Sequence, residues 1–297
     1  MTLPAIATNI TTYASHSPYI TGAEWQAAPT AIDTSDLIQG GSPDQQTQAV
    51  ADAIERASSW VDRICHTVLA ATQDTHRGRY LVNRWGTVRI PLPRKPILEV
   101  DSVSVGFRPS SMTVLTDLSD VDISPFGVIE VPVWGVTPPY PAGLGGVGIG
   151  SRPIVAVLYV NGWPNTTTSA DAAAGDTTLT LTSSLGVYPG TMLTVYDTTG
   201  GTEHVVVGPG FVAGSLSVPL VVPLLDAHDA GISVSNLPPV VKEASILLTS
   251  ALIQTRGDDA IVLDSMDEPS KVSPAYGANA DAERLATALL GDLIRAR

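Results

Sequence analysis

The residues of this sequence best suited to chemistry are its histidines and its single cysteine, and their spacing does not assemble a site. The five histidines are His16, His66, His76, His204 and His228. No two of them stand at the short separations typical of metal ligands, and Cys65 is the one thiol that could join them. The common hydrolase and nucleotide-binding motifs are also absent from the sequence. We therefore predict no metal, no cofactor and no catalytic residue, and expect a protein that is not an enzyme.

A glycine-rich stretch, residues 143–148, matches the G-x-G-x-x-G pattern of dinucleotide-binding proteins. That fingerprint needs a strand before it and a helix after it, so that the pyrophosphate meets the start of the helix. Here the glycines follow a proline-rich segment and precede Pro153. The pattern therefore predicts a loop.

Basic residues are concentrated in one short segment of an otherwise acidic chain. The formal net charge is −13, yet residues 77–95 contain six Lys or Arg and no acid. Alternation over residues 79–83 and 87–91 predicts a β-hairpin in this segment. The arginines of this basic hairpin are Arg77, Arg79, Arg84 and Arg89. They have three open interpretations: contact with the acidic surface of a neighbouring subunit or partner, contact with nucleic-acid phosphates, or ordinary solvated surface.

The strongest periodic pattern predicts a long helix over residues 42–71. Ser42 is an N-cap, Pro43 suits the first helical position, and Gln45 closes a capping box. Apolar residues then recur at the spacing of one helical face. We expect one side of this helix to pack the subunit core and its small residues to meet a neighbouring copy. The predicted subunit-interface residues are Val50, Ala53, Ile54, Ala57, Ser58, Trp60 and Val61.

The remaining elements complete an α+β prediction. Short helices are expected at residues 21–28 and from Pro239 to Gly257, and a last helix is expected over residues 279–297. Strands are expected at residues 97–105, 112–115, 128–133 and 154–160, and several more at short spacing within residues 165–236. The predicted fold is a small helical bundle core with a β-hairpin or short sheet and an inserted all-β module, sandwich- or barrel-like.

Three parts follow from this pattern. Residues 1–41 form an N-terminal arm with a short helix, residues 42–164 and 237–297 form the helical core with the hairpin and strands, and residues 165–236 form the inserted module. The apolar runs are far shorter than the roughly 20 residues that cross a bilayer, and residues 1–19 show no secretory signal. We expect a soluble protein that contacts no membrane.

The order of these parts resembles the head-to-tail adaptors of tailed phages, the connector rings beneath the portal. The segments that carry the resemblance are HSPYITGAEWQAAP, AIERASSWVDRICH, RYLVNRWGTVRIPLPRKPILEVDSVSV and LPPVVKEASILLTSALIQTRGDDA. The stretch AAAGDTTLTLTSS…PGTMLTVYD resembles β-modules found in long versions from actinobacterial phages. Smaller members of the family lack this module, so its role is not implied by the resemblance.

The resemblance implies a structural virion protein. It implies a homo-oligomeric ring, commonly of twelve subunits, that sits at the head–tail interface after assembly in the host cytoplasm. The implied partners are the portal protein, the next neck, stopper or tail-completion protein, and double-stranded DNA that passes through the lumen without sequence-specific binding, as in genome ejection. An alternative interpretation of the Thr- and Gly-rich module is a surface- or carbohydrate-binding protein of the virion.

The last helix is the predicted portal contact, because its apolar stripe suits helix-in-groove docking. The candidate residues are Leu285, Leu289, Leu293, Ile294, Arg295 and Arg297. The sequence predicts that removal of residues 279–297 leaves folding intact and abolishes assembly with the portal.

Overall fold

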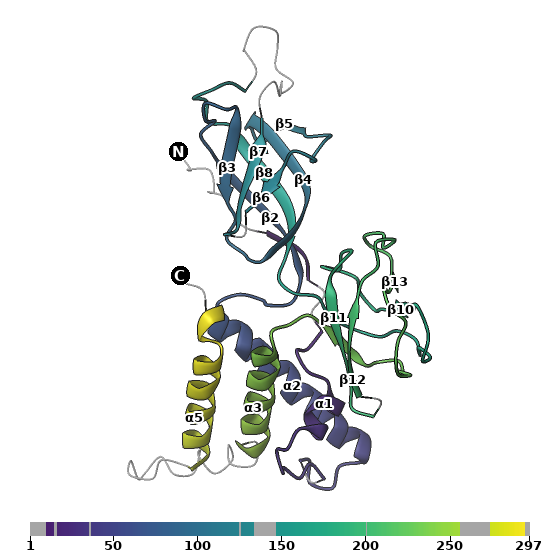
Figure 1. Cartoon of the computed structure of the whole chain (residues 1–297). Helices are drawn as coiled ribbons and strands as arrows, with labels where there is room; N and C mark the ends of the chain where they lie inside the picture. The colour runs from purple at the N-terminus through teal and green to yellow at the C-terminus, as the bar shows by residue number, and fades with distance from the viewer. Residues whose placement is uncertain are drawn as a thin grey trace, which may run out of the picture. The chain divides into compact units, whose positions relative to one another are not determined.

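The computed structural model describes residues 10–14, 17–35, 37–124, 126–133, 147–199, 201–255 and 274–294. The chain divides into two compact units. The strand unit comprises residues 1–15 and 71–163, and the helix unit comprises residues 16–70 and 164–297. Helices and antiparallel sheets are both present (Figure 1), which confirms the predicted α+β class.

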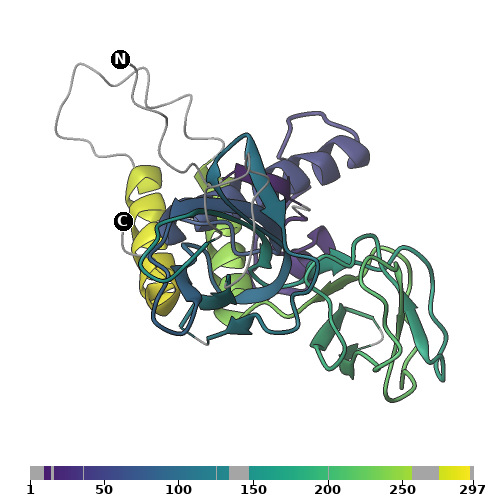
Figure 2. The same ribbon diagram turned by 90° about the horizontal axis from the view of Figure 1, so that it is seen from above.

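The strand unit is built from two antiparallel sheets around one apolar core. The five-stranded sheet has the order β1-β2-β8-β4-β5, and the three-stranded sheet has the order β3-β7-β6. Seen from above, these strands curve around a common centre (Figure 2). Alternate side chains such as Val88, Val103 and Val157 point into the core and are fully buried. The strand bounds are β1 Ile10–Ala14, β2 Thr72–Arg79, β3 Thr87–Pro91, β4 Ile97–Arg108, β5 Ser111–Val114, β6 Asp122–Ile123, β7 Val128–Pro132 and β8 Ile154–Asn161.

The predicted basic hairpin is wrong in its pairing. β3 pairs with β7, and the segment after β2 continues alongside the chain before β8, with Val82 N donating to Ser151 O at 3.0 Å. The Asn83 side chain explains the change of direction. Its Oδ1 accepts the backbone N–H groups of Trp85 and Thr87, which closes a turn in which Gly86 takes a positive φ of 77°. The turn therefore sends β3 to the second sheet.

The helix unit contains α1 Gly22–Ala27, α2 Pro43–Cys65, α3 Pro239–Thr255, α5 Pro274–Leu289 and the 3₁₀ turn η1 Gly291–Leu293. α3 packs against both α2 and α5 (Figure 1). Ile20 and Trp25 join Val50, Ile54 and Ile253 in a buried cluster between α1, α2 and α3. This cluster joins residues that lie more than 200 positions apart in the sequence.

Two predicted helix bounds are wrong. α2 has the predicted capping box at Ser42 and Gln45, but it ends at Cys65 because His66 adopts the left-handed conformation with φ 55°. The 23 residues of α2 span about 35 Å. The last helix begins at Pro274, ahead of the predicted start, and gives way to η1 after Leu289.

Within the helix unit, residues 165–236 fold as short strands around their own core. β9 Asn165–Thr167, β11 Met192–Asp197, β12 Gly201–Val206 and β14 Ser233–Ser235 form a sheet of order β12-β11-β14-β9. β10 Thr178–Thr180 pairs with β13 Ser217–Pro219. Leu179, Leu193, Val195 and Val234 are fully buried in the shared core. We call residues 165–236 the β-insert.

Candidate functional site: a buried ion pair and the surfaces around it

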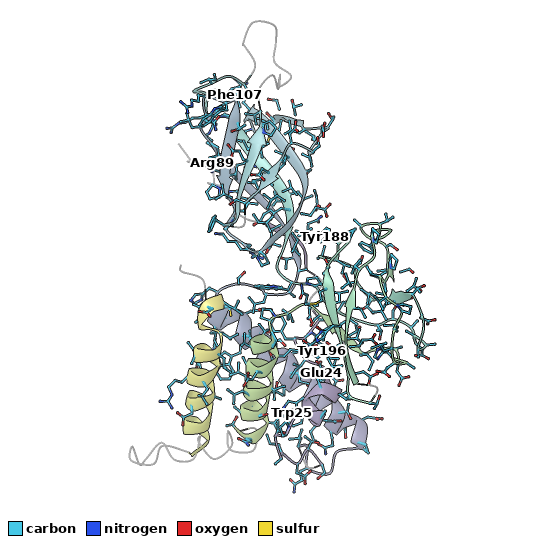
Figure 3. The ribbon with its side chains drawn as sticks, viewed as in Figure 1. Glu24, Trp25, Arg89, Phe107, Tyr188 and Tyr196 are labelled. Carbon is cyan, nitrogen blue, oxygen red and sulfur yellow. The ribbon has the colours of Figure 1, made fainter. Side chains whose placement is uncertain are left out.

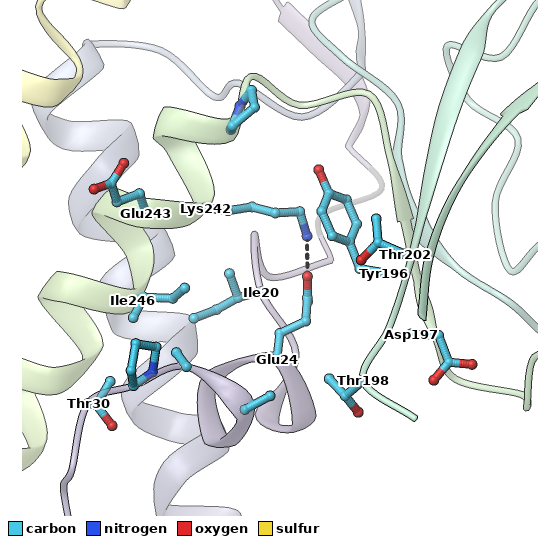
Figure 4. Close-up of a pocket in the computed structure, with 14 residues that line it drawn as sticks. Ile20, Glu24, Thr30, Tyr196, Asp197, Thr198, Thr202, Lys242, Glu243 and Ile246 are labelled. Atoms are coloured by element: carbon cyan, nitrogen blue, oxygen red, sulfur yellow. Dashed lines mark hydrogen bonds and ion pairs between the residues drawn. The ribbon is translucent and has the colours of Figure 1, made fainter. Parts of the chain in front are cut away.

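The helix unit has a hollow where the β-insert meets helices α1 and α3. Its volume is about 670 Å³ (Figure 4). The floor is apolar, with Ile20 and Ile246, and Thr198 and Thr202 of the β-insert line one side. Three charged side chains from different elements, Glu24, Lys242 and Glu243, also line it. The hollow therefore brings together the two parts of the helix unit that the sequence analysis treated separately.

A buried ion pair joins the walls of this hollow. Lys242 Nζ lies 2.6 Å from Glu24 Oε1, and the two side chains are 8% and 9% exposed. The ammonium also donates to Ser233 Oγ at 3.1 Å and lies 3.9 Å from the centroid of the Tyr196 ring. Figure 3 shows Glu24 and Tyr196 approaching each other from α1 and β11. Lys242 thus ties α3 to α1 and to two strands of the β-insert.

Local sequence places Glu24 for this role. It is the third residue of α1, where its Oε2 accepts the N–H of Thr21 at 2.7 Å and its own N–H donates to Thr21 Oγ1. One carboxylate oxygen caps the helix while the other binds Lys242. Trp25 Nε1 donates to Ser250 Oγ at 3.1 Å and adds a second link between α1 and α3. The capping box at Thr21, predicted from sequence, is confirmed.

The chemistry of Lys242 favours a structural role. Burial lowers the pKa of the Lys242 ammonium, and the Glu24 carboxylate opposes that shift. A nucleophilic lysine needs a free, neutral amine facing substrate. Here the amine is occupied by a carboxylate, a hydroxyl and a ring face. The group is therefore suited to holding elements together.

A second hollow, the α3–α5 groove, lies along the other side of α3. Its volume is about 600 Å³, and it shares Glu243 and Ile246 with the first hollow. Leu247 of α3 and Leu285 and Leu289 of α5 give it an apolar lining, and Glu243 and Asp281 add two carboxylates. Leu285 is 51% exposed, so the groove presents apolar surface to solvent.

The predicted portal residues fall partly in this groove. Leu285 and Leu289 line it, while Leu293 and Ile294 are half-buried at η1. Arg295 and Arg297 lie outside the described residues, as do residues 256–273 and most of the glycine-rich stretch at 143–148. That these side chains bind a portal stays a prediction.

The predicted subunit-interface residues lie almost entirely inside the subunit. Val50, Ala53, Ile54, Ala57, Ser58 and Val61 are at most 2% exposed, because they form the face of α2 that packs the chain's own core. Trp60 differs, since it is half-exposed and lies 5.2 Å from the Arg63 guanidinium. Contact with a neighbouring copy stays a prediction, and within this set Trp60 is the side chain that meets solvent in the single chain.

The four arginines of the predicted basic hairpin are exposed but do not form one patch. Arg77 and Arg79 lie on β2, and Arg84 stacks on Trp85 with its guanidinium 4.2 Å from the ring centroid. Arg89 lies on β3 beside Glu130 of β7 at 3.7 Å (Figure 3). Arg89 therefore already has an acidic partner within the strand unit.

Sequence reasoning missed a buried charged triad in the β-insert. His228 is 1% exposed, with Nδ1 3.0 Å from Asp197 Oδ2 and Nε2 3.2 Å from Glu203 Oε2. A neutral imidazole has one N–H, so donation to both carboxylates requires the protonated ring. Burial lowers the pKa of His228, but the hydrogen bonds and charges of Asp197 and Glu203 outweigh it and raise the pKa above its usual 6.5. The three residues are too scattered along the chain for a sequence motif to reveal them.

This triad predicts a pH-dependent stability. Because the folded pKa of His228 is raised, its contribution is complete below pH 6.5 and is lost as the pH rises through the folded pKa. We expect thermal unfolding of the wild type to shift to lower temperature above that pH, and the His228→Gln variant to show a flatter profile. His204→Gln, at an exposed position of β12, is the matched control and should keep the wild-type slope. Equal slopes in all three proteins would contradict the assignment.

Comparisons with known proteins give little to compare with. No family model and no curated protein matches the chain. Among solved structures, a chain of the neck of an empty GTA particle, computed with C6 symmetry, matches at 13% identity and a TM-score of 0.34. The match covers 94% of this chain and 95% of that chain. A similarity at this level does not establish a shared fold, and no argument below depends on it.

Two further observations concern the described residues alone. They contain no helix long and apolar enough to cross a membrane. They also contain no group of three or more His, Cys, Asp or Glu side chains placed to hold a metal ion.

Proposed function

We propose that this chain is a structural protein of the neck of a tailed phage, a head-to-tail adaptor that forms a ring under the portal. In this role it extends the DNA channel and provides the platform for the next neck protein. It acts by binding other proteins and carries out no catalysis. It reaches its place in the virion after assembly in the host cytoplasm.

One observation carries the proposal: three of the four segments that resemble the adaptor family interlock in a single core. The first contains Glu24 and Trp25, the second forms the last part of α2, and the fourth forms α3. Lys242 pairs with Glu24, Trp25 bonds to Ser250, and Ile54 packs in the same cluster as Ile253. Segments that share contacts as well as order support one conserved architecture better than separate pattern matches do.

The exposed side chains of the β-insert support protein contact over the carbohydrate-binding alternative. Its large apolar residues on the surface are aliphatic or methionine, whereas sugar rings stack best on aromatic faces. These residues are Met192, Val206, Val212, Leu216, Val221, Val222 and Leu225.

Electron microscopy of assembled particles tests the proposal. Necks purified from particles that carry a tagged copy of the chain should show the tag as a ring below the portal. Particles made without the chain should contain filled heads that lack tails. Tailed, infectious particles formed in its absence would overturn the adaptor role.

The predicted portal contact needs a gentler test than deletion of residues 279–297. Ala282, Ala286 and Leu290 are buried where α5 packs against α3, so removing the helix would uncover the core. We expect Leu293→Asp together with Ile294→Asp to leave the fold intact and to reduce portal binding at least about tenfold. Asp292→Ala, at an exposed neighbour, is the control and should bind as wild type. Unchanged capture of the double variant on immobilised portal would show that the contact lies elsewhere.

A further inference from the structure

One end of the strand unit carries an unusual surface, which we call the arginine tip. It comprises Arg79, Leu81, Arg84, Trp85, Ile149 and Arg152. The two segments lie side by side, because Val82 N donates to Ser151 O and Gly150 N donates to Val82 O, both at 3.0 Å. Arg79 reaches across to the carbonyl of Arg152 at 3.3 Å. These contacts hold the tip residues in one patch.

The tip combines exposed apolar bulk with unpaired positive charge. Leu81, Trp85 and Ile149 are 54%, 69% and 56% exposed. The salt bridges found among the described residues include none from Arg79, Arg84 or Arg152. Neither residues 75–98 nor residues 131–170 contain an acid. Trp and Arg are the residues that most often dominate binding energy at protein interfaces.

The charge of the whole chain is divided between its two units. The strand unit has eight Lys or Arg and seven Asp or Glu, a net charge of +1. The helix unit has eight Lys or Arg and 22 Asp or Glu, a net charge of −14. Two helix units placed face to face would repel each other, whereas a helix unit facing the strand unit of another copy would not.

We infer that the arginine tip of one copy docks in the α3–α5 groove of a second copy of this chain. The groove offers an apolar lining for Trp85 and Leu81, and carboxylates of Glu243 and Asp281 at its edges for the arginines. The contact joins two different surfaces, so it repeats head to tail and closes into a ring if the rotation permits. This inference rests on the proposed ring and names the surfaces that build it.

The groove assignment competes with the predicted portal contact at Leu285 and Leu289. A second copy supplies cations at the tip, which match the groove carboxylates. For this reason we assign these two leucines to the subunit contact and leave Leu293 and Ile294 to the portal.

A charge exchange between full-length proteins tests the inference. The tip variant carries Arg84→Glu and Arg152→Glu, and the groove variant carries Glu243→Lys and Asp281→Lys. Binding of each protein in solution to an immobilised copy is measured by surface plasmon resonance, with circular dichroism as the check on folding. Arg56→Glu with Arg63→Glu on α2 matches the charge change of the tip variant and serves as the control.

We expect wild-type self-association to weaken with salt, and each charge-reversed variant to bind itself at least about tenfold more weakly than wild type does. The tip variant mixed with the groove variant should recover binding, and the control should match wild type. Absence of wild-type self-association, or reversed variants that self-associate like wild type, would overturn the inference.

Two outcomes identify a different occupant and also overturn it. Loss of duplex-DNA binding in the tip variant, with self-association unchanged, would assign the tip to nucleic acid. Loss of portal binding in the groove variant alone would assign the groove to the portal. If the tip variant still forms rings on the portal, the inference fails while the adaptor function stands.

Discussion

Replacing Lys242 with methionine is expected to destabilise the helix unit by about 3–5 kcal/mol. The substitution leaves the Glu24 carboxylate, 9% exposed, without its cation, and it also removes the hydrogen bond to Ser233 and the contact with the Tyr196 ring. An uncompensated buried charge costs far more than the lost attraction alone. Denaturant unfolding followed by circular dichroism measures the change.

A second substitution separates charge from packing. Adding Glu24→Gln to Lys242→Met removes the unpaired charge, and Gln at this position still closes the capping box with Thr21. We expect the double variant to recover most of the loss, because neutral replacements of a buried ion pair are often tolerated. A double variant as unstable as the single variant would mean that the role of Lys242 is packing.

Asp74→Ala is expected to have an effect of similar size, about 3–5 kcal/mol, in the strand unit. The Asp74 side chain is fully buried in β2, where its Oδ2 accepts hydrogen bonds from Thr72 at 2.9 Å and Asn161 at 2.6 Å. Arg94 Nη1 lies 3.2 Å from the same oxygen. Removal of the carboxylate leaves a buried amide and a partly buried guanidinium without their acceptor.

Asp101→Ala supplies the matched control on the same sheet. Asp101 lies on β4, half-buried, and accepts one hydrogen bond from Gln73 at 2.6 Å. Its removal should cost about 1 kcal/mol or less, in line with partly solvated polar contacts. Equal losses in the two variants by chemical denaturation would refute a special role for the Asp74 network.

Local rules predicted the helices well because their signals lie within a few residues. The capping boxes at Thr21 and Ser42 and the apolar spacing of α2 and α3 are all short-range features. The end of α2 was missed because His66 ends it with a left-handed backbone conformation, which glycine and asparagine adopt far more often.

Strand pairing was less predictable, because it depends on partners far along the chain. Alternation located β3 correctly, but nothing local indicates that it pairs with β7 and leaves β2 to pair with β8. Asn83 carried a weak signal, since Asn favours turns that end a strand direction.

The charged contacts of the interior were the least predictable part. Lys242 and Glu24 lie 218 positions apart, and Asp197, Glu203 and His228 come from three separate segments. Each residue alone reads as ordinary surface charge. Their pairing follows from the fold, and a single sequence gives no sign of it.

The exposed basic residues occupy an intermediate position. The sequence located the positive segment, but the structure separates Arg89, which faces Glu130, from the arginines of the tip. It also adds Leu81, Trp85 and Ile149 as exposed apolar neighbours of that tip. Composition therefore predicted a contact surface, while its shape required the three-dimensional arrangement.

The central claim is that this chain assembles as a ring on a portal, and native mass spectrometry tests it most directly. The portal ring of the same phage is measured alone and again with excess chain. The account predicts one dominant complex whose added mass equals a fixed whole number of chains, twelve by the family resemblance, with few partly filled forms. A portal mass that does not change, or a broad distribution of one or two weakly bound copies, would contradict it.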